Sequence, residues 1–418
     1  MLEDESGRIQ LVGESVQNAQ LVTGVIAGAL GIETSGGEFE VVDLCYAGMT
    51  TPHDDAVPSD TMEMDRKYQI SYFAPATEIR TEPKLEDPGA AKCASLEEYV
   101  AFVSGLDVGG PSASDAQMQM LVEYLTGEGF GSGDVPVSQI TRLVIAGNSL
   151  APVGVLGPEI DEKDKKPVSG KLKWHWIYIT HGHLPSQRRY GYDTTSFSPH
   201  PILNLSGHLS DIAQSMPIHL LPGKTDPTGT LLPQQPLPRA MFGLSAAHSS
   251  FFCETNPAYI RVVSDADDSA NQGPDTRPGP STTDTKLDNR LILVTSGQTL
   301  DDMFKYLPSP PATRIGIAES TLRWRHVAPT APDTLWCHPY FTTDPFAITK
   351  IPDVYAIGCQ PDFATCIASD GSRRCRIVLL PSFSDTGVLV LVGLRTLQVR
   401  VVKFDVEGMD LKENGTSG

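Results

Sequence analysis

Five short loops carry the residues of this chain that could do chemistry. Each loop follows a strand-like apolar segment, and the loops read SGLDVGG (104–110), AGNSL (146–150), LPGKTDP (221–227), TSGQTLDD (295–302) and IGCQPDF (357–363). Ligands of α/β sheets bind at the carboxyl ends of the strands, so these loops define the candidate site. Carboxylates and amides such as Asp107, Asp226 and Asn148 can hold divalent metals, and a pair of such metals can activate water against a phosphodiester.

In order and content, these loops resemble those of the calcineurin-like metallophosphoesterases. Active members of that family carry Asp-x-His, Gly-Asp, Gly-Asn-His followed by Asp or Glu, a single His, and Gly-His-x-His. The resemblance implies that most of the metal ligands are replaced here, and that Asp226 keeps its type. The positions that correspond to the metal loops are, in chain order, Gly105 and Asp107, Asn148, Lys224, Thr225 and Asp226, Ser296, and Cys359 and Pro361.

The altered loops predict a chain that binds no metal or other cofactor and catalyses no hydrolysis. Loss of a residue that merely orients a metal ligand can lower metal affinity or activity about 10- to 100-fold, and here the ligands themselves are replaced. Lys224 would add positive charge where a dication would sit. We therefore expect Asp107, Asn148 and Asp226 to be structural residues that cap loops and helix starts.

The composition and net charge of the chain favour some classes of function and disfavour others. The chain has 418 residues, 40% of them hydrophobic and 20% charged, which is typical of a soluble globular protein of two or three domains. Its formal net charge of −19 disfavours a broad contact with nucleic acid, so any role on DNA is expected to be indirect. The seven cysteines include no CxxC spacing and are expected to be buried, reduced thiols.

No signal peptide and no membrane span is expected, which favours an intracellular protein. The N-terminal residues MLEDESGRIQ have neither a basic start nor an apolar stretch, and no apolar run reaches about 18 residues.

Residues 1–50 are expected to form a small β domain. Strand-like segments lie at 7–13, 21–33 and 38–49, and Gly24, Gly28 and Gly31 fit bends or bulges within them. Three strands make only part of an oligonucleotide/oligosaccharide-binding (OB) barrel, which needs five. Either preceding strands are missing, or later segments complete the sheet.

Residues 95–405 are expected to form a second domain in which strands and helices alternate. Apolar strand segments precede the five loops, amphipathic helices are expected at 115–129, 200–216 and within 290–307, and late strands are expected at 375–383 and 387–404, the last bent or split at Gly393. The fold class is therefore α+β and α/β multidomain, with a partial OB barrel followed by a second domain. The resemblance implies that this second domain is a calcineurin-like β-sandwich flanked by helices.

Four segments are expected to lie outside the folded domains. Residues 51–94 are rich in Pro, Asp and Glu and predict a linker that wraps the surface. Residues 160–195 and 265–289 are insertions in the second domain, the latter almost free of apolar residues and therefore disordered, and 406–418 form a disordered tail.

Longer segments resemble the B-subunits of the eukaryotic replicative DNA polymerases, which keep a phosphoesterase scaffold without its metals and place an OB barrel before it. The likeness is greatest to the second, regulatory subunits of polymerase delta. It runs from Leu2 to about Phe404 and is carried by LEDESGRIQLVG (2–13), VTGVIAGALG (22–31), VAFVSGLDVGG (100–110), LLPGKTDPTGTLLPQQPL (220–237), SGQTLDDMFKYL (296–307), LRWRHVAPTAPDTLWCHPY (322–340) and VYAIGCQPDFAT (354–365).

The resemblance implies a non-catalytic scaffold in DNA replication and repair, located in the nucleus. Members of that family bind the cysteine-rich C-terminal domain of the catalytic subunit and hold a third, clamp-binding subunit. They can also serve the catalytic subunit of polymerase zeta. No zinc or iron–sulfur ligand pattern is present in this chain, as expected if the metal cluster belongs to the partner.

The aromatic-rich run 324–346 is a candidate partner interface. A protein that bridges two partners needs exposed apolar surface, and the run contains Trp324, Trp336, Tyr340 and Phe346. The alternative is that these rings simply cover the sheet, because aromatic residues dominate cores and interfaces alike. Cys337, His338 and Asp344 in the same run are expected to form a packed loop rather than a metal site.

Two other function classes remain open at this point. An active metal-dependent phosphodiesterase or nuclease would show manganese-stimulated cleavage that Asp226→Ala abolishes. A single-stranded DNA-binding OB protein would bind oligonucleotides in a salt-sensitive manner. The first 50 residues offer for that role one basic residue, Arg8, and two aromatic residues, Phe39 and Tyr46.

Residues 168–187 (VSGKLKWHWIYITHGHLPSQ) are hypothesised to be a retained intron in the coding sequence. Val-Ser at the start can be encoded GTGAGT and Gln187 can be encoded CAG, which are the usual ends of an intron. Transcript sequencing is expected to show these codons and a shorter spliced form. Other codons at the two ends would contradict the hypothesis and leave a genuine insertion.

Overall fold

The computed structural model describes residues 1–5, 7–49, 97–110, 115–128, 135–152, 199–262, 290–371 and 373–405, together with the backbone of 77–79. The insertions at 160–195 and 265–289, the hypothesised intron, the tail at 406–418 and most of the linker at 51–94 lie outside these residues. Within the described part of the chain, no helix is long and apolar enough to cross a membrane.

The N-terminal domain is a four-stranded sheet. Strands β1 (Leu2–Asp4), β2 (Gly7–Val12), β3 (Gly28–Glu33) and β4 (Glu38–Cys45) lie in the order β1-β2-β4-β3, and helix α1 (Glu14–Asn18) follows β2. The expected strand at 21–33 begins only at Gly28, because Gln20 and Gly24 have φ angles of 48° and 79°, outside the range of a strand. A bulge at Gly31 confirms one expected irregularity, since a Cβ there would lie 2.1 Å from the carbonyl oxygen of Glu40.

The second domain contains two six-stranded sheets. One has the order β13-β14-β12-β11-β10-β5 and the other β16-β15-β6-β7-β8-β9. The strands are β5 (Thr77–Ile79), β6 (Tyr99–Val103), β7 (Ile140–Ala146), β8 (Ile218–Leu221), β9 (Phe251–Cys253), β10 (Ala258–Val262), β11 (Arg290–Thr295), β12 (Val354–Gln360), β13 (Ala364–Asp370), β14 (Arg373–Pro381), β15 (Val388–Gly393) and β16 (Val399–Lys403).

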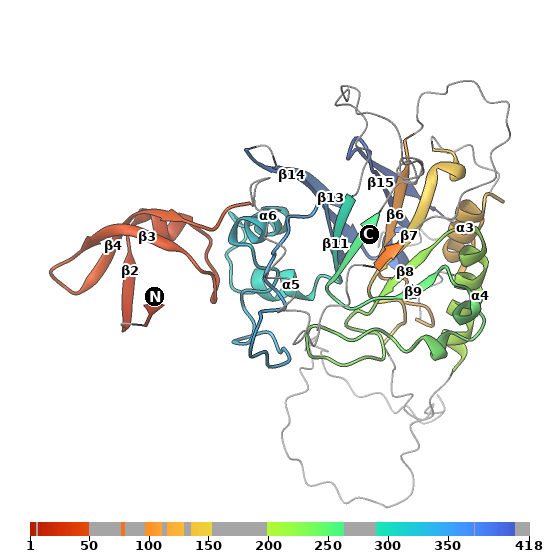
Figure 1. Cartoon of the computed structure of the whole chain (residues 1–418), viewed down its shortest axis with the longest axis horizontal. Helices are drawn as coiled ribbons and strands as arrows, with labels where there is room; N and C mark the ends of the chain where they lie inside the picture. The colour runs from red at the N-terminus through yellow and green to blue at the C-terminus, as the bar shows by residue number, and fades with distance from the viewer. Residues whose placement is uncertain are drawn as a thin grey trace, which may run out of the picture. The chain divides into compact units, whose positions relative to one another are not determined.

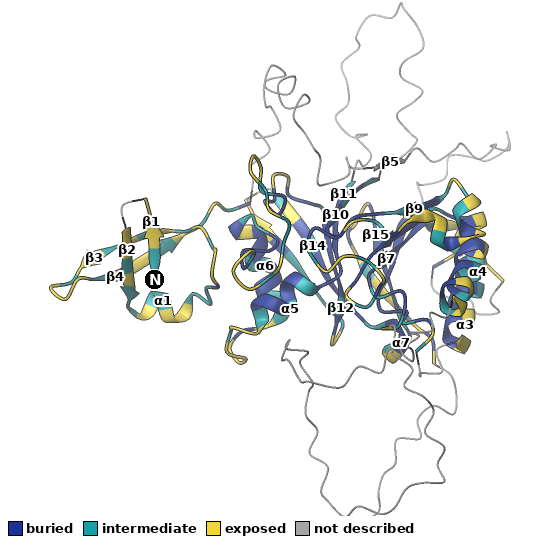
Figure 2. Ribbon diagram, turned by 90° about the horizontal axis from the view of Figure 1, so that it is seen from below, coloured by how far each residue is buried: buried dark blue, intermediate teal, exposed yellow. Residues whose placement is uncertain are grey.

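The two sheets face each other across one apolar core. Alternate residues of both sheets, such as Phe102 and Val144 on one and Ile292 and Val378 on the other, form a single buried cluster. Figures 1 and 2 show the buried strands between two pairs of helices. The result is a β-sandwich with helices on both outer faces.

The outer face of each sheet is covered by its own helices. Helices α3 (Asp115–Thr126) and α4 (His200–Ser215) form one apolar cluster with β6, β7 and β8. Helices α5 (Gln298–Phe304) and α6 (Arg314–Trp324) form another with β11, β12 and β14. The remaining short helices are α7 (Phe383–Thr386), η2 (Val137–Gln139), η4 (Arg239–Phe242) and η5 (Ser245–Ala247).

Most of the strands and helices expected in the second domain are confirmed. The last apolar segment splits at Gly393, where β15 ends before β16 returns antiparallel to it. Strands β9, β10 and β13, helices α6 and α7 and the short 3-10 helices η2, η4 and η5 were not expected. Strand β5 also lies within the expected linker, and it pairs parallel to β10 at the edge of its sheet.

Candidate functional site

The five candidate loops meet at one edge of the sandwich. Strands β6, β7 and β8 are mutually parallel, as are β11 and β12, so within each sheet the loops that follow them share an edge. Backbone N–H groups of Gly105 and Asp107 donate to the carbonyl oxygens of Gly147 (2.9 Å) and Asn148 (3.1 Å). The two sheets approach closely here, because a Cβ on Gly147 would lie 2.4 Å from Cβ of Ser296.

Asp226 is a buried acceptor for backbone N–H groups of two loops. Its side chain accepts from the N–H of Gly223 (2.7 Å) and Ser149 (3.3 Å) through Oδ2 and from that of Leu150 (2.9 Å) through Oδ1. Burial raises the pKa of the carboxyl, whereas these N–H groups lower it by favouring the ionised form. The expectation that Asp226 is structural agrees with this arrangement.

Asn148 links the same two loops. It adopts a left-handed backbone conformation with φ 52°, which asparagine tolerates better than most residues. Its Oδ1 accepts from the N–H of Thr225 at 3.2 Å, and the Thr225 hydroxyl donates to the carbonyl oxygen of Leu150 at 2.7 Å. Asn148 and Thr225 therefore bind protein groups, as Asp226 does.

Asp107 also has a left-handed backbone, with φ 46°, and contacts two serines that follow β14. Its Oδ2 accepts from the hydroxyl groups of Ser384 (3.1 Å) and Ser382 (3.5 Å). Burial raises the pKa of this carboxyl, and the hydrogen bond from Ser384 opposes the shift. The loop after β6 is thereby attached to the loop after β14.

Cys359 is the third non-glycine residue of the site with a left-handed backbone, at φ 53°. Its N–H donates to the hydroxyl of Ser104 at 2.9 Å, and its Sγ lies 3.7 Å from the carbonyl oxygen of Ala146. Burial raises the thiol pKa far above its ordinary value. This shift favours the neutral thiol over the thiolate.

Ser296 belongs to a buried network of neutral side chains that the sequence did not indicate. Its hydroxyl accepts from Nδ2 of Asn256 at 2.5 Å, and its N–H donates to Oδ1 of the same residue at 3.0 Å. Asn256 also donates to Oε1 of Gln234 at 2.7 Å, and that oxygen accepts from Gln298 at 3.0 Å. Gln234 and Asn256 lie outside the five loops. The only feature of the sequence that could have indicated their role is that both have amide side chains, which can donate and accept hydrogen bonds.

The remaining loop positions differ in exposure. Lys224 and Pro361 are exposed, and Gly105 is buried with φ 63° against Ser382. No three His, Cys, Asp or Glu side chains within the described ranges are grouped in a way that could hold a metal ion. The side chains of Asp107, Asn148 and Asp226 all bind protein groups, so the arrangement holds the loops to each other.

The four aromatic residues expected at an interface divide into two groups. Trp324 and Phe346 are 6% and 0% exposed and belong to apolar clusters, so for them the alternative reading as core is favoured. Trp336 is 71% exposed, and Tyr340 is half-buried with its hydroxyl 3.1 Å from Asp344 Oδ2. Phe341, which the sequence analysis did not single out, is 94% exposed. Asp344 also accepts from His326 at 2.8 Å.

Comparison with known proteins matches both domains to components of DNA polymerases. Residues 100–265 and 278–365 match the family of DNA polymerase alpha/epsilon B-subunits. The chain belongs to this family. Residues 1–44 match the OB-fold domain of the DNA polymerase delta subunit, which confirms the expected OB type of the N-terminal domain.

Relatives of this B-subunit family member carry the name DNA polymerase delta small subunit or subunit 2. The small subunit of Arabidopsis thaliana is 32% identical over 97% of this chain and 72% of its own length. That of Saccharomyces cerevisiae is 29% identical over 97% of this chain and 70% of its own length. Subunit 2 of Drosophila melanogaster is 28% identical over 97% of this chain and 74% of its own length.

Replacement of Asp226 by asparagine in this B-subunit family member is expected to destabilise the loop edge. The Asn side chain would turn an NH₂ donor toward backbone N–H donors, leaving one or more of them unpaired. The free energy of unfolding should fall by about 1–3 kcal/mol in urea titrations. The exposed Asp362→Asn serves as control and should change it by less than about 0.5 kcal/mol. Equal stability of the two variants would contradict the role assigned to Asp226.

Proposed function

We propose that the chain is a non-catalytic accessory subunit of DNA polymerase delta that acts in DNA replication and repair in the nucleus. The observation that carries this proposal is the similarity, over 97% of the chain, to delta small subunits of a plant and a yeast. The OB domain and the sandwich each match a family of DNA polymerase subunits. The similarity therefore covers both domains and does not rest on a single widespread fold.

The sandwich is proposed to be a calcineurin-like phosphoesterase fold that has lost its metal ligands. Two packed sheets with helices outside and five loops at one edge support this reading. The side chains at the metal-loop positions bind neighbouring loops: Asp226 and Asn148 accept from backbone N–H groups, and Asp107 accepts from serines. Metal ligation would require these bonds to break, each at a cost of about 0.5–1.5 kcal/mol.

The chain is further proposed to bridge other polymerase subunits. The partners expected from the family resemblance are the cysteine-rich C-terminal domain of the catalytic subunit, a third clamp-binding subunit, and the catalytic subunit of polymerase zeta. Trp336 and Phe341 offer exposed apolar surface for such a contact. Exposed aromatic side chains are enriched at the centres of protein interfaces, which supports a role for this pair.

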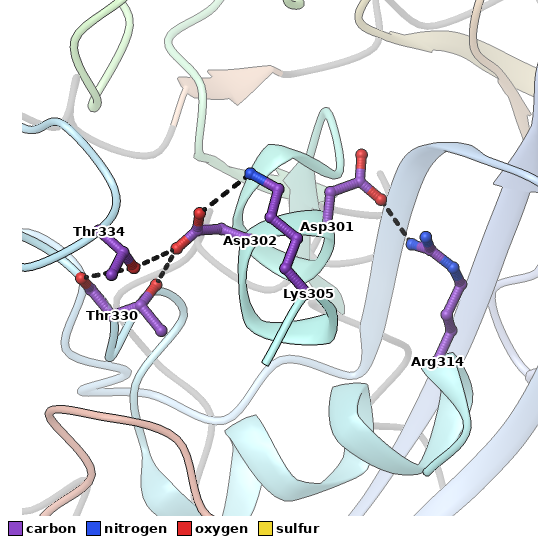
Figure 3. Close-up of polar contacts among 6 residues, drawn as sticks. All are labelled: Asp301, Asp302, Lys305, Arg314, Thr330 and Thr334. Carbon is purple, nitrogen blue, oxygen red and sulfur yellow. Dashed lines mark hydrogen bonds and ion pairs between the residues drawn. The ribbon is translucent and has the colours of Figure 1, made fainter. Parts of the chain in front are cut away.

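The loop that presents Trp336 is anchored to α5 by a buried carboxylate. Figure 3 shows Asp302 accepting from the hydroxyl groups of Thr330 and Thr334, each at 2.7 Å, and pairing with Lys305 at 3.3 Å. The neighbouring Asp301 pairs with Arg314 at the start of α6. A fixed loop loses less conformational freedom on binding, which suits it to present a contact surface.

Co-expression with the cysteine-rich C-terminal domain of the catalytic subunit tests this function. We expect the full chain to co-purify with that domain as a stable complex. The double variant Trp336→Ala/Phe341→Ala should weaken the complex about tenfold or more, as measured by surface plasmon resonance. Leu203→Ala, at an exposed apolar residue of α4 (59% exposed), is the matched control and should bind within about twofold of wild type.

A negative result for the wild-type chain and one for the double variant would contradict different parts of the proposal. Absence of a complex with folded wild-type chain would contradict the bridging role. A complex that the double variant forms as tightly as wild type would leave the accessory role intact and exclude Trp336 and Phe341 from the interface.

A further inference from the structure

A cavity rich in arginine lies at the opposite end of the strands from the candidate loops. It has a volume of about 280 Å³ and is lined by Arg290, Asp353, Arg373, Arg374 and Arg395, together with apolar residues and Thr396. Arg290 and Arg373 begin the parallel-running strands β11 and β14, whereas the candidate loops follow strand ends. Strands of six or seven residues span about 20 Å, so this cavity is separate from the site described above.

The cavity wall is fixed by hydrogen bonds. Arg290 pairs with Asp353 at 2.9 Å and donates to the carbonyl oxygens of Leu394 (2.7 Å) and Arg395 (3.1 Å). The carboxylate of Glu97 accepts from the N–H groups of Arg395 and Thr396, both at 3.0 Å. The start of β11 and the turn between β15 and β16 are therefore held together, and a ligand would meet a preformed wall.

Positive charge is concentrated in this cavity although the chain as a whole is acidic. Four arginines and one aspartate line it, in a protein with a formal net charge of −19. Burial lowers the pKa of the neighbouring Arg376, and the positive charge of Arg374 acts in the same direction. Like charges that line one cavity repel each other, and an anion among them would relieve that repulsion.

We propose that this cavity binds a phosphate group presented by a phosphorylated serine or threonine of a partner polypeptide. Guanidinium groups bind phosphate oxygens through paired, charge-assisted hydrogen bonds. A phosphorylated side chain carries about two negative charges and three acceptor oxygens, so it gains more from a cluster of positive charge than the single charge of a carboxylate does. A compact ligand is favoured over a nucleic acid strand, because the acidic surface of the chain repels an extended polyanion.

Binding of labelled peptides to the full chain tests this inference by fluorescence anisotropy. The probes are a Gly-Ser peptide with one phosphoserine, the same peptide with serine or aspartate at that position, and an oligothymidine strand. The phosphopeptide is expected to bind more tightly than the other three probes. Arg374→Ala/Arg395→Ala should weaken its binding about tenfold, since both residues are exposed and their loss leaves the core intact.

The matched control removes two exposed arginines elsewhere. Arg8 and Arg323 have side chains 66% and 55% exposed, and the Arg8→Ala/Arg323→Ala variant should bind the phosphopeptide within about twofold of wild type. Equal loss in both double variants would overturn the inference by showing a nonspecific charge effect. Equal or tighter binding of the aspartate peptide or the oligonucleotide would overturn the assignment to phosphate on a polypeptide.

Discussion

The loop edge of the sandwich depends on the buried carboxylate of Asp226. Three backbone N–H groups from two loops donate to it, and none of these donors has water as an easy alternative once the edge is closed. An unpaired buried donor costs about 1–3 kcal/mol, so this one side chain fixes the loops after β7 and β8 relative to each other. Asn148 adds a second link between the same loops through Thr225.

Hydrogen bonds also attach these loops to the other sheet. Asp107 connects the loop after β6 to serines after β14, and Ser104 connects the end of β6 to Cys359 near the end of β12. Ser296, Asn256 and Gln234 form a neutral network at the end of β11. These hydrogen bonds between loops stabilise this edge of the sandwich.

The sequence predicted the parts of the fold that have strong periodicity. Buried strands such as Tyr99–Val103 and Ile140–Ala146 are continuous apolar runs, and α4 has a clear apolar face, so their positions could be read directly. Helix α6 escaped prediction because its buried face includes the small residue Ala318 and the polar residue Thr321, which weaken the apolar pattern. Strand β5 has three residues and depends on pairing with β10, which no local pattern encodes.

The sequence predicted where the candidate site lies, but not which hydrogen bonds its side chains form. The order of the five loops was enough to place them at one edge, since parallel strands end on the same side. The partners of Asp226 and Asn148 are backbone groups, and a backbone N–H leaves no residue-type signal in a sequence. The sequence around Trp324 and Phe346 likewise does not show whether they are buried, because aromatic residues are common in cores and in interfaces.

The most direct test of the central claim is a phosphodiesterase assay on the purified full chain with manganese. If the loop side chains serve only to bind each other, hydrolysis of bis(p-nitrophenyl) phosphate should equal that of manganese in buffer without protein. Hydrolysis at least about tenfold above that background, lost in folded Asp107→Ala and Asp226→Asn variants, would contradict a purely structural role for these side chains.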